Sequence, residues 1–142
     1  MPDLLSKVCQ RAFKYIFYDE VRLFELFSAL NLLAWAKVLI VQPGLLNTEV
    51  YRSFSVIEAT VWAYCFGVIA LAQIAATLIK CWYPVELRFV AMALCSGAWT
   101  TVAWNFWQSS ISTTANLNYT LLALGCAISG AFLGWKTTSY QS

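Results

Sequence analysis

The chain has 142 residues, of which 61% are hydrophobic and only 11% are charged, and its formal net charge is +2 at pH 7. Soluble domains have roughly 25% charged residues, so this composition nearly excludes a soluble monomer. The sequence contains no histidine, which excludes histidine-based metal sites, histidine general bases and histidine-activated nucleophiles.

The first 20 residues combine basic and apolar positions at helical spacing. Lys7, Arg11 and Lys14 recur on one face, and apolar residues occupy another. This pattern predicts an amphipathic helix over residues 1–20 that lies on the membrane surface, with the basic side chains in contact with lipid. The alternative is that the helix simply leads into the first span. The segment does not have the organisation of a signal peptide.

Four apolar stretches follow, each about as long as the ~20 residues that a helix needs to cross a bilayer. They cover about residues 22–41, 54–79, 85–107 and 117–135. None of them alternates with the period of two that a membrane strand requires. We therefore predict an all-α fold, a polytopic four-helix transmembrane bundle over residues 21–142 that follows the N-terminal amphipathic surface helix.

The distribution of basic residues predicts the orientation of these spans. With four spans, seven basic residues fall on the side of the two termini: Lys7, Arg11, Lys14, Arg22, Lys80, Arg88 and Lys136. Arg52 falls in a loop on the other side. Cytoplasmic loops are enriched in Lys and Arg, so both termini are expected to be cytoplasmic. Trp82, Trp107 and Trp135 lie near span ends, where tryptophan contacts the lipid interface.

Two charged residues fall inside the predicted spans near the outer interface. Lys37 lies four residues before the end of the first span, and Glu58 lies four residues after the start of the second. A charge at membrane depth is costly and is usually paired, so we predict an intramembrane Lys37–Glu58 ion pair. The alternatives are that Lys37 extends to the interface and that Glu58 lies among the headgroups.

Three amides are also placed at depth: Asn31 near the centre of the first span, Gln73 in the second and Asn105 in the third. Such groups usually bond neighbouring helices together. They could instead line a water-filled path, for which Asn31 is the best candidate because it is the deepest.

Small residues recur at a spacing of four in the last two spans. Gly125 and Ser129, and then Gly130 and Gly134, form two such motifs, and Gly97 with Thr101 forms a third. This spacing lets helices approach closely. It predicts either packing within the bundle or self-association through the last span.

The sequence shows no site for chemistry. Its five cysteines are scattered without a CxxC pair, and its seven acidic residues are dispersed. We therefore expect no enzyme activity, no metal and no cofactor. The basic residues are juxtamembrane, so the expected partners are the lipid bilayer and other membrane segments rather than nucleic acid.

The second half of the chain is similar in its pattern of residues to small four-span membrane proteins of tailed bacteriophages, some of them labelled as holins. The similarity covers residues 58–136 and comprises residues 61–67 (VWAYCFG), residues 70–73 (ALAQ), Tyr83-Pro84 with Leu87-Arg88, and an Ala-rich span that ends in tryptophans. It implies a location in the bacterial inner membrane and a holin-like permeabilising role.

Three functions remain open from the sequence. The first is a holin-like protein that oligomerises through its transmembrane helices and permeabilises the membrane. The second is a non-catalytic assembly or scaffold subunit of a membrane complex. The third is a small dimeric transporter that uses Glu58, although the inverted halves typical of transporters are not visible in the sequence.

Overall fold

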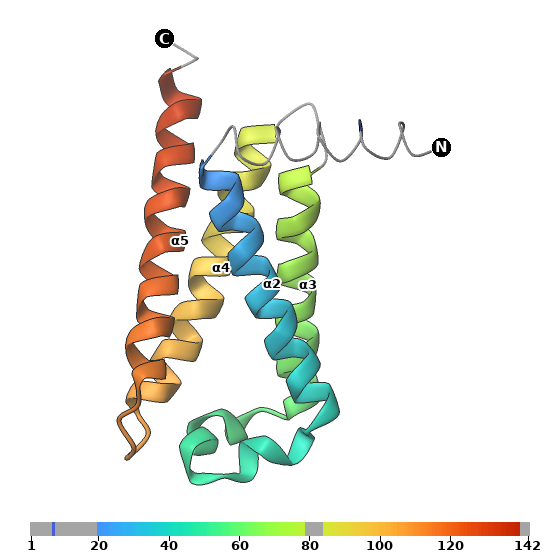
Figure 1. The fold of residues 1–142 in the computed structure, drawn as a ribbon, viewed down its shortest axis with the longest axis vertical. Helices are drawn as coiled ribbons and strands as arrows, with labels where there is room; N and C mark the ends of the chain where they lie inside the picture. Colours follow the sequence, from blue (N-terminus) through green and yellow to red (C-terminus); the bar gives the residue numbers. More distant parts are fainter. Residues whose placement is uncertain (1–6, 8–19, 79–83, 140–142) are drawn as a thin grey trace.

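The computed structural model describes Lys7, residues 20–78 and residues 84–139, and every regular element in that part of the chain is a helix. The described elements are α2 (Glu20–Val41), η1 (Pro43–Asn47), η2 (Glu49–Val56), α3 (Ala59–Leu78), α4 (Pro84–Trp107) and α5 (Thr114–Ser139) (Figure 1). The all-helical prediction is confirmed for these residues. The predicted amphipathic helix over residues 1–20 lies outside them, apart from its last residue and Lys7, which is helical and exposed.

Local sequence explains several helix ends. Pro43 follows the end of α2, and Pro84 is the first residue of α4, where its missing N–H costs nothing. α5 begins after Thr113, whose backbone amide and hydroxyl both donate to Asn116 Oδ1 at 3.3 and 3.1 Å. The Asn116 side chain thus bonds back to the Thr113 amide as the glutamate of a capping box does.

The α-helix of the second apolar stretch begins later than the stretch itself. Residues 49–56 form η2, a 3-10 helix, rather than α-helix, and α3 begins at Ala59. The Phe54 side chain of η2 is buried in the core, and its carbonyl accepts a hydrogen bond from Trp62 Nε1 at 3.1 Å. The buried Phe54 side chain thus packs η2 against the end of the bundle. The helix of the last apolar stretch, α5, begins at Thr114, three residues before that stretch.

The α-helices form two antiparallel hairpins, α2–α3 and α4–α5. Contacts within each hairpin far outnumber those between the hairpins, and α2 and α5 touch little. In Figure 1 these two helices diverge toward the end of the bundle that η1 and η2 cover. The contact surface between the two hairpins is called the seam below.

Aromatic rings fill the seam at the η1–η2 end. The Trp35 ring of α2 lies 5.6 to 6.5 Å, centroid to centroid, from five rings on η2, α3, α4 and α5: Tyr51, Phe54, Phe66, Phe106 and Tyr119. Offset and edge-on ring pairs of this kind add to the apolar stabilisation of a core. They hold the polar connection between α2 and α3 against the bundle.

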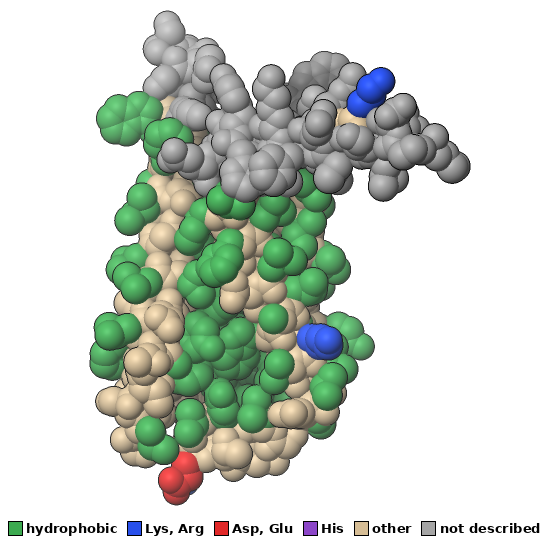
Figure 2. Space-filling view, viewed as in Figure 1, with side chains coloured by type: hydrophobic (Ala, Val, Ile, Leu, Met, Phe, Trp, Pro, Cys, Tyr) green, Lys and Arg blue, Asp and Glu red, His purple; other side chains and the backbone are tan. Residues whose placement is uncertain are grey.

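Three of the described helices are long and apolar enough to cross a membrane: Val21–Val41, Ala59–Leu78 and Thr114–Trp135. The 24-residue α4 is long enough but is not among them, since Glu86, Arg88 and Asn105 lower its hydropathy. Large apolar side chains are nevertheless exposed on all four α-helices, and Figure 2 shows them covering the visible face.

Candidate functional site

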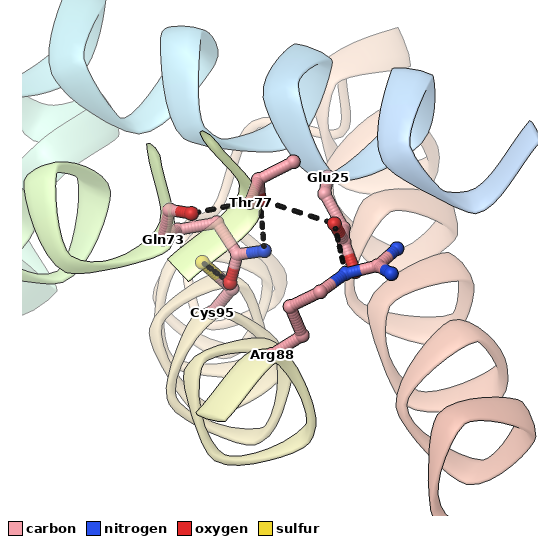
Figure 3. A network of polar contacts seen from close by, with 5 residues as sticks. All are labelled: Glu25, Gln73, Thr77, Arg88 and Cys95. Atoms are coloured by element: carbon pink, nitrogen blue, oxygen red, sulfur yellow. Dashed lines mark hydrogen bonds and ion pairs between the residues drawn. The ribbon is translucent and has the colours of Figure 1, made fainter. Parts of the chain in front are cut away.

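A cluster of polar side chains lies in the seam near the ends of the helices opposite η1 and η2 (Figure 3). It comprises Glu25 of α2, Gln73 and Thr77 of α3, and Arg88 and Cys95 of α4, and we call it the polar cluster. Arg88 Nε lies 3.0 Å from both carboxylate oxygens of Glu25. The cluster therefore joins three of the four α-helices at one point.

Further hydrogen bonds complete the polar cluster. The Thr77 hydroxyl lies 3.0 Å from Glu25 Oε2 and 2.8 Å from the Gln73 carbonyl, either of which can accept its proton. Gln73 Nε2 donates to Thr77 Oγ1 at 3.3 Å, and the Cys95 thiol donates to Gln73 Oε1 at 3.8 Å. Glu25 is 0% exposed and Arg88 is 5% exposed. This burial strengthens their attraction but also removes the hydration of both charges.

A second set of polar contacts continues along the seam toward η1 and η2. Ser28 Oγ lies 3.2 Å from Cys126 Sγ and accepts a hydrogen bond from Trp99 Nε1 at 2.8 Å. The Trp99 ring stacks on Tyr119 with centroids 5.6 Å apart, and the Tyr119 hydroxyl accepts a hydrogen bond from Trp35 Nε1 at 3.2 Å. Polar side chains from different helices thus contact one another at several levels along the seam.

The structure does not bring Lys37 and Glu58 together, and both side chains are exposed. A Cβ atom on Gly67 would lie 3.8 Å from the Ala36 Cβ, so this part of α2 is level with Gly67. Glu58 precedes Gly67 by nine residues, which is about 13 Å along a helix axis. The prediction placed Glu58 inside a span, whereas it lies just before α3, where its carbonyl accepts hydrogen bonds from the first-turn amides.

The three predicted amides have separate environments. Gln73 is fully buried in the polar cluster. Asn105 is buried too, and its Nδ2 donates to the Thr101 carbonyl one turn earlier in the same helix at 2.7 Å. The three therefore do not line one path.

Asn31 of α2 lines two hollows whose other lining residues include Tyr119 of α5. Its Nδ2 donates to the Phe27 carbonyl at 2.8 Å. Two adjoining hollows of about 460 and 320 Å³ share Asn31 and Tyr119 in their linings. Both lie where α2 and α5 diverge, so the central amide of α2 has open space beside it.

The small residues of α5 pack against side chains of the same chain. A Cβ atom on Gly125 would lie 2.5 Å from Phe24 of α2, and one on Gly134 would lie 3.2 Å from Phe89 of α4. Gly130 faces Met92 of α4 in the same way, at 3.5 Å. Ser129 is half-buried, and Gly97 of α4 has open space. These contacts account for the glycines of α5 by packing within the bundle.

We expect the change of Gly125 to Ala to lower the free energy of unfolding by about 1–3 kcal/mol, because the new methyl group must displace the Phe24 ring. Gly97→Ala is the matched control, since nothing lies within 4 Å of its Cβ position. There the better helix propensity of alanine should leave stability unchanged or raise it by up to about 1 kcal/mol. Unfolding in detergent micelles measures both changes, and equal effects would contradict the packing described here.

The predicted lipid-contacting residues are partly described. Lys7 is exposed, whereas Arg11, Lys14 and Trp82 lie outside the described residues. Trp107 is exposed and its Nε1 donates to Thr120 Oγ1 at 3.0 Å, and Trp135 is 78% exposed. Trp107 and Trp135 both lie near helix ends, as an interfacial role requires.

Sequence reasoning missed the importance of Glu25 and Arg88. Glu25 was counted among dispersed acids, and Arg88 among the basic residues that flank a loop. A usable signal was present, because each lies three residues inside a predicted span and both spans enter the bilayer from the same side. That equal depth makes them candidate partners, although only the packing of α2 against α4 brings them into contact.

No group of three His, Cys, Asp or Glu side chains among the described residues could hold a metal ion. Comparison with protein-family models, with curated proteins and with solved structures finds no match to this chain. Its function is therefore argued from the seam and from the apolar surface.

Proposed function

We propose that this chain is a four-span protein of the bacterial inner membrane that permeabilises the bilayer in a holin-like manner and has no enzyme activity. Both termini lie on the cytoplasmic side, and several copies assemble through their transmembrane helices. The observation that supports this role best is the polar seam between the two hairpins. The similarity of residues 58–136 to small bacteriophage membrane proteins points the same way.

The packing of the four α-helices supports the proposal that all of them lie in the membrane. Three of them are apolar enough to span, and α4 packs extensively along α5 and also contacts α3. The charge of Arg88 does not oppose its insertion, since Glu25 neutralises it inside the bundle. α4 is therefore proposed as the fourth span.

The polar cluster buries two charges, and the loss of their hydration offsets much of the stability that the ion pair contributes. Replacement of a buried ion pair by apolar residues is often neutral or stabilising, so such a pair is weak evidence for stability. Ionisable residues inside a membrane more often mark a path for water or ions. We therefore propose that the protein has a second conformation in which the Glu25–Arg88 pair is exposed to water.

Separation of the hairpins along the seam would produce that state. The side chains that bond across the seam, including Glu25, Ser28 and Arg88, would then face outward from each hairpin. In an assembly of several copies these faces would line a water-filled lesion, while the apolar outer faces stay in lipid. α2 makes few contacts with α4 and α5, which favours separation along this surface.

A scaffold or assembly subunit is the second candidate. It is favoured by the packing of Gly125, Gly130 and Gly134 against Phe24, Met92 and Phe89 of the same chain. That packing leaves the motifs of α5 occupied within one bundle, as expected for a closed subunit whose partners bind its outer surface.

Controlled expression in bacteria distinguishes the two functions. We expect an abrupt loss of membrane potential, followed by arrest of growth, once the protein has accumulated, as read by a potential-sensitive dye. Accumulation in the membrane fraction without loss of potential would contradict permeabilisation and favour the scaffold subunit.

A crosslink across the seam tests the proposed opening directly. Ser28 Oγ lies 3.2 Å from Cys126 Sγ, so Ser28→Cys should form a disulfide between α2 and α5 under oxidising conditions. In dye-loaded liposomes we expect this variant to release dye only after reduction. The matched control combines Ser28→Cys with Cys95→Ala and Cys126→Ala, because the Cys95 thiol of α4 also lies close to Ser28, and it should release dye in both conditions. Equal release from the oxidised and reduced crosslinking variant would contradict opening along the seam.

A further inference from the structure

We infer that Lys37 and the apolar hollow beside it form a binding site for an anionic phospholipid, whose phosphate pairs with the Lys37 ammonium and one of whose acyl chains lies in the hollow. The inference rests on the membrane placement of α2 and α3 proposed above. It does not depend on permeabilisation.

The hollow lies between α2 and α3, on a different side of α2 from the hollows at Asn31, and measures about 330 Å³. Ala36, Ala63 and Gly67 contribute to its lining, and such small residues leave space between the two helices. Val68 and Leu71 of α3 continue the lining away from Lys37. Every lining residue except Lys37 is uncharged, so the hollow suits a hydrocarbon chain better than a polar ligand.

Lys37 has no hydrogen bond or ion pair with any described residue. It lies four residues before the end of α2, which is about 6 Å inside the helix. Its predicted partner Glu58 lies just before α3, about 13 Å along the helix axis from Gly67, which is level with Ala36. A lysine at this depth extends its four methylene groups toward the interface and places its charge among the headgroups.

Charge complementarity identifies the occupant. The phosphate of an anionic phospholipid keeps a net negative charge for Lys37, whereas a zwitterionic lipid has its own amine close to the phosphate. The methylene groups of Lys37 and the lining toward Leu71 then follow the acyl chain into the bilayer.

Native mass spectrometry of the full chain, released from detergent with phosphatidylglycerol or phosphatidylcholine present, tests the site. We expect the wild-type chain to retain phosphatidylglycerol in preference to phosphatidylcholine. Lys37→Gln should weaken retention of phosphatidylglycerol roughly fivefold, the effect of one charge near the membrane surface. Lys37→Arg, which keeps the positive charge, should retain phosphatidylglycerol as the wild-type chain does.

Val68→Phe fills the hollow without changing any charge and should also reduce phosphatidylglycerol retention. Arg52→Gln is the matched control, because Arg52 is an exposed cation of η2 that does not line this hollow. It should retain the lipid as the wild-type chain does. Equal retention by Lys37→Gln, equal retention of the two lipids, or a second copy of the chain in place of the lipid would overturn the inference. A chain absent from the membrane fraction would instead contradict the proposed membrane placement.

Discussion

Replacement of Arg88 by Met should lower the free energy of unfolding by about 3–5 kcal/mol, because it removes the guanidinium group that bonds both oxygens of the buried Glu25 carboxylate. Arg88 Nε lies 3.0 Å from both Glu25 oxygens, and both side chains are buried in the seam. Unfolding of the purified chain in detergent micelles, followed by circular dichroism against added denaturing detergent, measures the change.

The double variant Glu25→Leu with Arg88→Met should recover most of this loss, since it removes both charges and keeps apolar volume in the seam. Glu86→Gln is the matched control on the same helix, because Glu86 is exposed. It should change stability by less than about 0.5 kcal/mol. If Arg88→Met proves as mild as Glu86→Gln, the pair does not hold the bundle together in the way its geometry indicates.

Replacement of Trp99 by Ala should cost about 3–5 kcal/mol, as expected for truncation of a large buried aromatic side chain. Trp99 is 0% exposed and stacks on Tyr119 with an interplanar angle of 9°. Its Nε1 also donates to Ser28 Oγ at 2.8 Å, so the change removes a hydrogen bond across the seam as well as volume. The same unfolding measurement in micelles applies.

Trp104 supplies the control for this second change. It lies on α4 five residues after Trp99 and is 65% exposed. Trp104→Ala should therefore cost much less than Trp99→Ala, since no cavity forms in the bundle. Trp99→Phe should fall between the two, because it keeps most of the ring volume and loses the donor to Ser28. Similar losses for Trp99→Ala and Trp104→Ala would contradict the assignment of Trp99 to the seam.

The apolar helices were predictable because apolarity and length are properties of a segment alone. Pro43 and Pro84 marked helix boundaries that the structure confirms. The start of the second span was not predictable in this way. Residues 54–58 are apolar enough to extend a helix, and only the burial of Phe54 against Trp35 and Trp62 shows why they do not.

The candidate site was predictable only in part. A charge in a span indicates an unusual environment, so Lys37 was found from the sequence, and Gln73 was found as an amide at depth. The hydrogen-bond partners of Gln73 were not found, and the partner predicted for Lys37 is not in contact with it. Glu25 and Arg88 are 63 residues apart in the chain, and their contact depends on how α2 crosses α4. Ser28 and Cys126 are 98 residues apart and meet for the same reason.

The sequence by itself determined that this chain is helical, that most of its length is too apolar for a soluble domain, and where its helices end at proline. These properties follow from composition and from local backbone chemistry. The tertiary structure alone decided that Glu25 pairs with Arg88, that Glu58 does not reach Lys37, and that the glycines of α5 face Phe24, Met92 and Phe89. Such contacts depend on the relative rotation and level of packed helices, which the sequence of each helix taken alone leaves open.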